Sequence, residues 1–347
     1  MVRVRFAPSP TGSLHLGSAL TAVANRRVAD EHGGTMLLRI DDTDPSRTLE
    51  GAVEAIIGDL DWLGVRYDDG PVRQSERSER HREAAQSLAD ATTDEDGALR
   101  LGKTTLLRAD GSPTYPLASA VDDLDFAISH VIRGSDHREG AELHERLIRA
   151  LGGPVPEYVH HSLLLGPDGK KLSKRHGASS LDELREAGIP PEAVRAYLEE
   201  LGLPRHDIAY DEGRLRRLST EAIAAMSDDE LAGRLDVPAS VVPAARGARD
   251  LAEARRFADQ ILVAPATPGS VERQTLDRFR ELRERANGEL DPEGAKAIVR
   301  ELKAVGGDLR SLRLALTGAE HGPELWTIVL ALPRGEALRR AAAAATF

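Results

Sequence analysis

The chain has 347 residues, enough for two or three domains that each bury a hydrophobic core. Its formal net charge of −11 disfavours a surface coated for nucleic acid, and the absence of cysteine excludes disulfides and thiolate metal sites, so we expect no zinc. No stretch approaches the roughly 18 apolar residues of a membrane span, and we expect a cytoplasmic protein.

Strands and helices alternate over the first part of the chain. The apolar pattern predicts strands at residues 2–6 and 36–40, and helical spacing predicts helices at 19–31 and 48–63. The turns between them are short. This order of elements is typical of a parallel α/β sheet.

The pattern then continues with a polar helix at 75–89 and an acidic loop at 91–97. Further strands are predicted at 104–108, 130–134 and 158–165, with a helix at 137–151. Beyond about residue 180 only helices are predicted, with a Pro/Ala-rich linker at 264–269. The sequence therefore predicts an α/β domain followed by an α-helical C-terminal region.

Two stretches have the residues of a phosphate site. His15, Gly17 and Ser18 precede a helical pattern, and the free N–H groups of a helix N-terminus suit a phosphate. The basic loop at 170–175 holds three of the six lysines of the chain, although most basic residues elsewhere are arginine. Lysine ammonium groups are suited to neutralising a transferring phosphate. A helix start without a role and a solvated basic loop are the plainer alternatives.

A third group of side chains surrounds the likely C-terminal edge of the sheet: Arg5, Asp41, Tyr115 and Arg133. Arg5, Asp41 and Arg133 each lie in or just past a predicted strand. Ligands of open α/β sheets bind at the carboxyl ends of the strands. Arginines could bind a carboxylate there and an acid could bind an ammonium, which suits an amino acid with an acidic side chain. Structural ion pairs explain the same residues equally well. The acidic run at 122–125 is more typical of a cap or turn than of a magnesium site.

Several motifs occur together in one order. They are R-F-A-P-S-P-T-G-S-L-H-L-G-S at 5–18, L-R-I-D-D-T-D-P at 38–45, D-G-S-P-T-Y at 110–115, H-V-I-R-G-S-D-H at 130–137 and D-G-K-K-L-S-K-R-H-G at 168–177. In these motifs the chain resembles the glutamyl-tRNA synthetases, which are class I aminoacyl-tRNA synthetases. The resemblance covers nearly the whole chain and includes that family's "HIGH" and "KMSKS" elements.

The resemblance implies a ligase that forms glutamyl-adenylate from L-glutamate and ATP, with Mg²⁺ arriving on ATP, and then charges tRNA(Glu). His15, Lys171 and Lys174 would be catalytic. The ATP site would comprise Pro8, His15, Gly17, Ser18, Lys171, Leu172 and Lys174. The glutamate site would comprise Arg5, Ala7, Ser9, Asp41, Tyr115, Ser119 and Arg133. Asp41 and Ser119 depart from the usual Glu and amide of the family.

The resemblance also implies three parts. A Rossmann-like catalytic domain would span residues 1–178, with the family's acceptor-stem insertion reduced to about 75–104. A helical region resembling the stem-contact region would span 179–263, and a reduced helical domain resembling the anticodon-binding domain would span 264–347. We expect a monomer whose tRNA binding is weakened by the short insertion.

Two alternatives stay open. In the first, the activated glutamyl group passes to a different acceptor, such as a modified tRNA base, a carrier protein or a small amine. In the second, the chain is a non-catalytic regulator that binds an amino acid. Retention of His15, Lys171 and Lys174 argues against the second.

Overall fold

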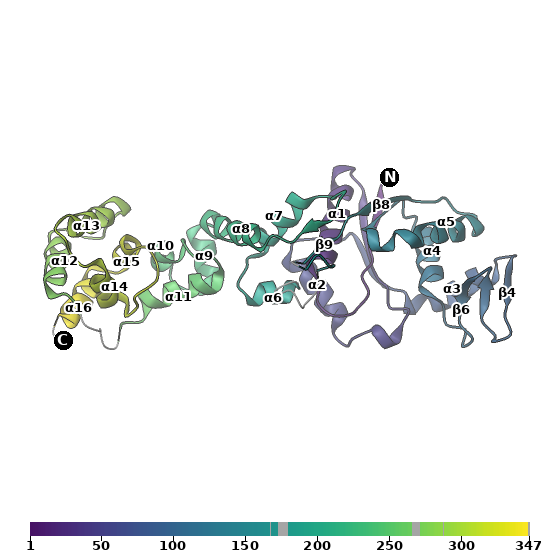
Figure 1. Cartoon of the computed structure of the whole chain (residues 1–347), viewed down its shortest axis with the longest axis horizontal. Coiled ribbons are helices and arrows are strands. Elements are labelled where there is room, and N and C mark those ends of the chain that lie inside the picture. Colours follow the sequence, from purple (N-terminus) through teal and green to yellow (C-terminus); the bar gives the residue numbers. More distant parts are fainter. Residues whose placement is uncertain (167, 173–179, 266–270, 287, 346–347) are drawn as a thin grey trace. The chain divides into compact units, whose positions relative to one another are not determined.

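The computed structural model describes residues 1–166, 168–172, 180–265, 271–286 and 288–345 (Figure 1). The chain forms two compact units. The first comprises Met1–Glu186 and Val194–Glu212, and the second comprises Ala187–Ala193 and Gly213–Phe347. The three-part division expected from the sequence stays a prediction.

The first unit is built on parallel strands. In one group β1, β2 and β3 pair in that order, and in the other β7 pairs with β8. The backbone N–H of Ser129 donates to the carbonyl of Arg3 at 2.9 Å, so β7 begins beside β1. The strands are β1 (Arg3–Phe6), β2 (Thr35–Ile40), β3 (Asp69–Arg73), β7 (His130–Gly134) and β8 (Glu157–His161). The predicted parallel α/β architecture is confirmed.

Helix α1 (Leu16–Glu31) connects β1 to β2, and α2 (Ala52–Trp62) connects β2 to β3. Five of the six residues of β2 are buried, as expected for a strand covered on both faces. Helix α2 starts later than its apolar pattern predicts, because Gly51 takes a left-handed conformation at its N-cap. The end of β1 and the start of α1 lie at the same edge of the sheet.

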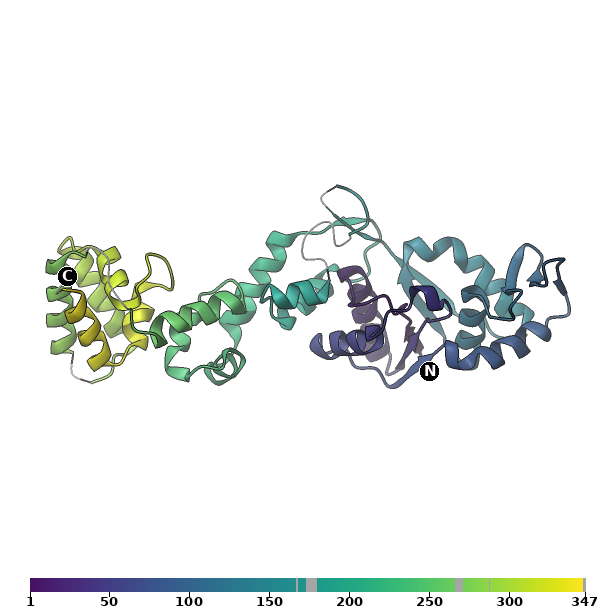
Figure 2. The same ribbon diagram turned by 90° about the horizontal axis from the view of Figure 1, so that it is seen from below.

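A small antiparallel sheet follows β3 (Figures 1 and 2). Its strands are β4 (Ala91–Thr93), β5 (Leu99–Leu101) and β6 (Thr104–Leu107). Its apolar side chains share a core with α3 (Ser78–Gln86), α4 (Tyr115–Asp125) and α5 (Ala141–Ala150). The expected acidic loop at 91–97 therefore begins as a strand, and the helix expected at 75–89 is shorter and follows a 3-10 turn.

The sequence did not predict α4, because its acidic run at 122–125 is more typical of a turn. The helix tolerates these carboxylates because arginines from distant segments pair with them. Asp123 pairs with Arg5 and Arg39, and Asp125 pairs with Arg80. Tertiary contacts have overridden the local pattern.

The first unit ends with a pair of two-residue parallel strands, β9 (Leu164–Leu165) and β10 (Ile208–Ala209). Helix α6 (Leu181–Glu186) lies between them in the chain, and α7 (Pro191–Leu201) includes residues of both units. The expected strand at 158–165 is divided into β8 and β9 by Ser162 and Leu163.

The second unit is α-helical, as predicted. Its core is formed mainly by Leu, Ile and Ala side chains around the fully buried Phe279. The helices are α8 (Glu212–Ala225), α9 (Asp228–Leu235), α10 (Val242–Ala245), α11 (Leu251–Leu262), α12 (Arg273–Arg285), α13 (Pro292–Ala304), α14 (Leu309–Thr317), α15 (Leu325–Ala331) and α16 (Arg334–Ala344). Within the described residues no helix is both long and apolar enough to cross a membrane.

Candidate active site

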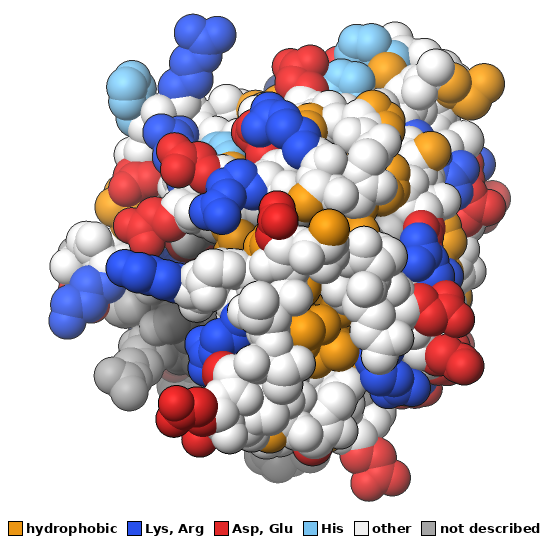
Figure 3. Space-filling view, turned by 90° about the vertical axis from the view of Figure 1, so that its right-hand side faces the viewer, with side chains coloured by type: hydrophobic (Ala, Val, Ile, Leu, Met, Phe, Trp, Pro, Cys, Tyr) orange, Lys and Arg blue, Asp and Glu red, His pale blue; other side chains and the backbone are white. Residues whose placement is uncertain are grey.

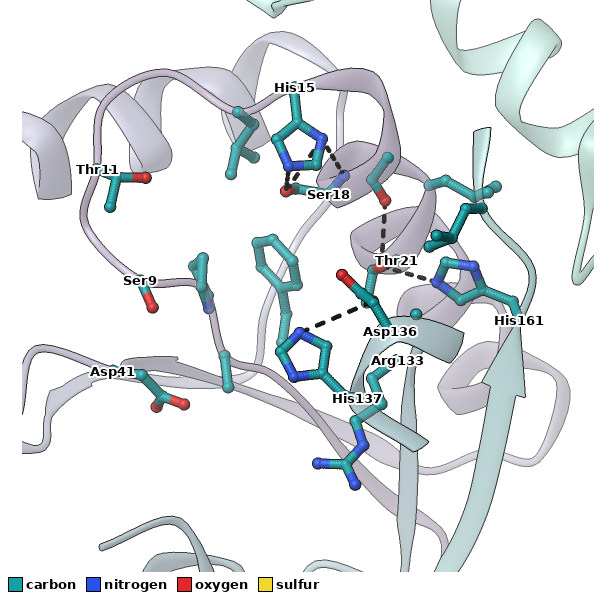
Figure 4. A pocket seen from close by; sticks show the side chains of 18 of the residues that line it. Ser9, Thr11, His15, Ser18, Thr21, Asp41, Arg133, Asp136, His137 and His161 are labelled. Atoms are coloured by element: carbon teal, nitrogen blue, oxygen red, sulfur yellow. Dashed lines mark hydrogen bonds and ion pairs between the residues drawn. The ribbon is translucent and has the colours of Figure 1, made fainter. Parts of the chain in front are cut away.

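A cavity of about 440 Å³ lies in the first unit, where β1, β2 and β7 end and α1 begins (Figure 4). It brings together twelve of the residues singled out from the sequence. These are Arg5, Ala7, Pro8, Ser9, His15, Gly17, Ser18, Asp41, Tyr115, Arg133, Lys171 and Leu172. Lys174 lies outside the described residues, and Ser119 does not line the cavity.

His15 is the N-cap of α1. Its Nδ1 accepts a hydrogen bond from the Ser18 backbone N–H at 3.1 Å, so the neutral ring carries its hydrogen on Nε2. Burial lowers the pKa of His15, and the nearby Lys171 ammonium lowers it further. A Cβ on Gly17 would lie 3.1 Å from the ring. At neutral pH the histidine is therefore an uncharged N–H donor at a helix N-terminus.

The turn before His15 is tied to α2 through Asp59. The Asp59 Oδ2 accepts from the Leu14 backbone N–H at 2.7 Å and from the Ser13 hydroxyl at 2.9 Å. Arg185 donates to the other carboxylate oxygen at 3.1 Å. Sequence reasoning missed Asp59 because its partners lie some 45 residues away in the chain. It positions the start of α1.

Lys171 approaches the cavity from the basic loop. Its Nζ lies 2.5 Å from the Asp136 Oδ2, just past the end of β7, and both side chains are partly exposed. Asp136 and His137 also line the cavity, although neither was singled out from the sequence. Their place directly after a core strand, within the motif at 130–137, was the signal that could have found them.

At the other end of the cavity two buried charges are already paired. Asp41 accepts from Arg39 Nε at 2.7 Å and Nη2 at 3.3 Å, and Arg5 Nε lies 3.2 Å from Asp123 Oδ1. Arg39 is fully buried and also donates to Asp123 at 2.6 Å. One arginine thus holds both carboxylates in place.

Ser119 belongs to this network rather than to the cavity wall. It is fully buried and its hydroxyl accepts from Arg39 Nη2 at 3.0 Å. The contact of Ser119 with glutamate that the resemblance implies stays a prediction. Through Arg39, Ser119 is linked to Asp41.

The acidic run on α4 consists of paired carboxylates. Asp122 accepts hydrogen bonds from Arg77 and His81, each at 2.8 Å. Asp123 and Asp125 form ion pairs with arginines. Over the described residues no group of three or more His, Cys, Asp or Glu side chains is arranged to hold a metal ion. The magnesium interpretation of this run has no support in the contacts, which are those of ion pairs.

Arg133 differs from Arg5 and Lys171, which pair with carboxylates. It is 6% exposed, and within the described residues no carboxylate lies within ion-pair distance of it. Burial lowers the pKa of Arg133, and the neighbouring Arg5 lowers it further. The charge of this guanidinium is therefore available to a bound anion.

Comparison with known proteins identifies the family. Residues 1–94 and 91–221 match the family described as tRNA synthetases class I (E and Q), catalytic domain. The chain is 35% identical to glutamate–tRNA ligase 1 of Rubrobacter xylanophilus, across 98% of this chain and 96% of that relative. The chain belongs to the glutamate–tRNA ligase family of class I synthetases. The resemblance seen in the sequence is confirmed.

A second relative supports this membership, and a solved structure shares the fold. Glutamate–tRNA ligase 1 of Methylobacterium sp. is 32% identical across 98% of both chains. The crystal structure of a glutamate tRNA ligase from Elizabethkingia meningosepticum, in complex with its amino acid, shares the fold with a TM-score of 0.79 over 99% of both chains at 23% identity. The alignment with the Rubrobacter ligase spans 419 positions, so that ligase has segments without a counterpart in these 347 residues.

Proposed function

We propose that this chain activates L-glutamate with ATP to form glutamyl-adenylate and transfers the glutamyl group to tRNA(Glu). The observation that carries the proposal is the division of one cavity into two ends. One end has a helix N-terminus, the His15 N–H and Lys171, and the other has the uncompensated Arg133 beside Arg5 and Asp41. A triphosphate suits the first end and an acidic amino acid the second.

In this mechanism the α-carboxylate of glutamate attacks the α-phosphorus of ATP, and pyrophosphate leaves with its Mg²⁺. His15 and the N–H groups at the start of α1 donate to phosphate oxygens, while Lys171 and Lys174 neutralise charge that develops there. A hydroxyl of the tRNA 3′ end then attacks the carbonyl carbon of the adenylate, and AMP leaves. Mg²⁺ belongs to the nucleotide and needs no cluster of protein carboxylates.

Arg5 and Arg133 would bind the side-chain carboxylate of glutamate, and Asp41 its ammonium. The pairing of Asp41 with Arg39 orients the carboxylate before the substrate arrives, which reduces the entropy lost on binding. Ala7 and Ser9 would complete this end of the cavity with Tyr115.

A different acceptor is the second candidate, and one observation favours it. At the end of the first unit that carries β4–β6, the acidic and basic side chains of the described residues are interspersed and form no continuous basic patch (Figure 3). Since phosphate contacts supply most of the affinity for nucleic acid, this face is poorly suited to an acceptor stem. Activation without an ordinary tRNA is compatible with the same cavity.

Labelled glutamate, ATP and total tRNA distinguish the two candidates. The proposal predicts label on intact tRNA and none on tRNA whose 3′-terminal adenosine has been removed. Label that survives removal of the adenosine would favour a modified base, and adenylate formation without any label on tRNA would favour a carrier protein or a small amine.

A further inference from the structure

Two uncharged rings support the Arg133 guanidinium. Arg133 on β7 lies in register with His160 on β8, and its Nε donates to the His160 Nε2 at 3.3 Å. Tyr158 precedes His160 by two residues and therefore shares its face of the strand. The Arg133 Cζ lies 5.3 Å from the centre of the Tyr158 ring, which is stacked with the His160 ring at 6.2 Å.

This support differs from that of Arg5, Lys171 and Arg39. Arg5 and Lys171 each face a carboxylate, and the buried Arg39 faces two. A carboxylate partner fixes a guanidinium but cancels most of its charge. A neutral acceptor and a ring face fix it and leave the charge in place.

The protonation state of His160 is consistent with this role. Burial first, and then the nearby charges of Arg133 and Arg138, lower the pKa of His160 to about 4. At neutral pH its Nε2 therefore has a free lone pair for Arg133. The Arg133 Nη2 is buried and has no hydrogen-bond partner among the described residues, so its N–H groups remain for a ligand.

Figure 4 shows the Arg133 guanidinium and the Asp41 carboxylate on the side of the cavity away from His15. We propose that His160 and Tyr158 are positioning residues that hold Arg133 without neutralising it, and that this neutral support makes the site prefer a substrate carboxylate over the corresponding amide. The inference rests on the proposed function, since it concerns the end of the cavity assigned to glutamate.

The test measures ATP–pyrophosphate exchange with total tRNA for H160Q, H160F and H160E, with glutamate or glutamine as substrate. H160F keeps a ring and removes the acceptor, so its KM for glutamate should rise about tenfold while the KM for ATP stays unchanged. H160Q keeps an acceptor oxygen and should stay within about threefold of the wild type. H160E places a carboxylate against Arg133 and should lower the glutamate-to-glutamine preference about tenfold or more.

H130Q is the matched control, because His130 lies on β7 outside the cavity and pairs with Glu157 at 3.5 Å. Its KM values should equal those of the wild type. A glutamate preference in H160E equal to that of the wild type would overturn the inference, even if H160F failed to fold. A wild-type chain without glutamate-dependent exchange would overturn the proposed function and the inference together, whereas active but indistinguishable variants would overturn the inference alone.

Discussion

Arg39 is the residue on which the amino-acid end of the cavity depends. It lies on β2 with no exposed surface and donates to Asp41, Asp123 and Ser119. Through Asp123 it is linked to Arg5. Removing one partner of such a buried set leaves uncompensated charge, which costs more than the original interaction gained.

Arg39→Met should therefore lower the free energy of unfolding by about 3 kcal/mol or more, because it leaves two buried carboxylates without their shared partner. Thermal and urea unfolding measure this loss. Arg149→Met is the control, since Arg149 forms an exposed pair with Glu145 on α5 and should change stability by less than about 1 kcal/mol. Equal effects of the two substitutions would contradict the network described for Arg39.

Lys171 and Lys174 are assigned to the phosphate end. Lys171→Ala and Lys174→Ala should each reduce the exchange rate about 100-fold or more, the usual effect of removing one preorganised charge from a transition state. Lys296→Ala, in the second unit, should leave the rate unchanged, since Lys296 pairs with Glu293 and lies over Trp326. Normal exchange in both loop variants would remove lysine from the mechanism.

At the scale of elements, α1 connects the cavity edge of the sheet to the start of β2. Its N-terminus is held by His15 and by the ties of Leu14 to Asp59, and its C-terminus returns to β2 through Gly33 and Gly34. A Cβ on Gly34 would lie 2.2 Å from the carbonyl oxygen of Val2. The close approach of this turn to β1 therefore requires glycine.

Gly34→Ala should destabilise the first unit by about 1–3 kcal/mol, because the added methyl group can be accommodated only if the backbone moves. Gly58 on α2 is the matched position, since a Cβ there meets nothing within 4 Å. Gly58→Ala should stabilise by about 0.5–1 kcal/mol through helix propensity. If Gly34→Ala and Gly58→Ala changed the free energy of unfolding in the same direction, this packing would be contradicted.

The elements that the sequence predicted are those with strong local patterns. Continuous apolar residues identified β2, and helical spacing identified α1 and most of the second unit. Helix α4 was missed because its carboxylates are compensated by Arg5 and Arg39, which lie more than 80 residues away. Asp59 and Asp136 were missed for the same reason: the importance of each depends on a partner that only the fold brings near.

The site was predictable to the extent that its residues lie in motifs. Twelve of the fourteen residues singled out from the sequence line one cavity. The motifs did not indicate which of these charged side chains pair with other residues of the protein. Asp41 and Arg5 are already paired, whereas Arg133 is supported by His160 and Tyr158. The Arg133–His160 contact follows from strand register and the Arg5–Asp123 pair from the packing of α4, neither of which a motif contains.

At the scale of the whole molecule, buried histidines couple stability to pH. Burial lowers the pKa of His144 to about 3, whereas an unfolded histidine has a pKa of about 6.5. Between these values the unfolded chain binds a proton that the folded chain does not. The stabilising contribution is therefore fully present above pH 6.5 and is lost progressively as the pH falls.

Stability should thus fall between pH 7.5 and pH 5, with His144 alone contributing about 2 kcal/mol of the decrease. His144→Gln should show a smaller decrease over the same range, because glutamine does not titrate. Urea unfolding at the two pH values measures both chains. The same pH dependence in the wild type and the variant would show that His144 is protonated in the folded chain.

The first unit has both the cavity and a face at β4–β6 on which the described acidic and basic side chains are interspersed. The central claim is that this cavity activates glutamate with ATP. The most direct test is ATP–pyrophosphate exchange with total tRNA present, comparing glutamate with glutamine and aspartate. The account predicts glutamate-dependent exchange that is at least about tenfold faster than exchange with glutamine or aspartate. Glutamine leaves the charge of Arg133 without a carboxylate partner, and aspartate places its carboxylate in the wrong position. ATP binding without exchange for any amino acid would contradict it and would favour a non-catalytic regulator.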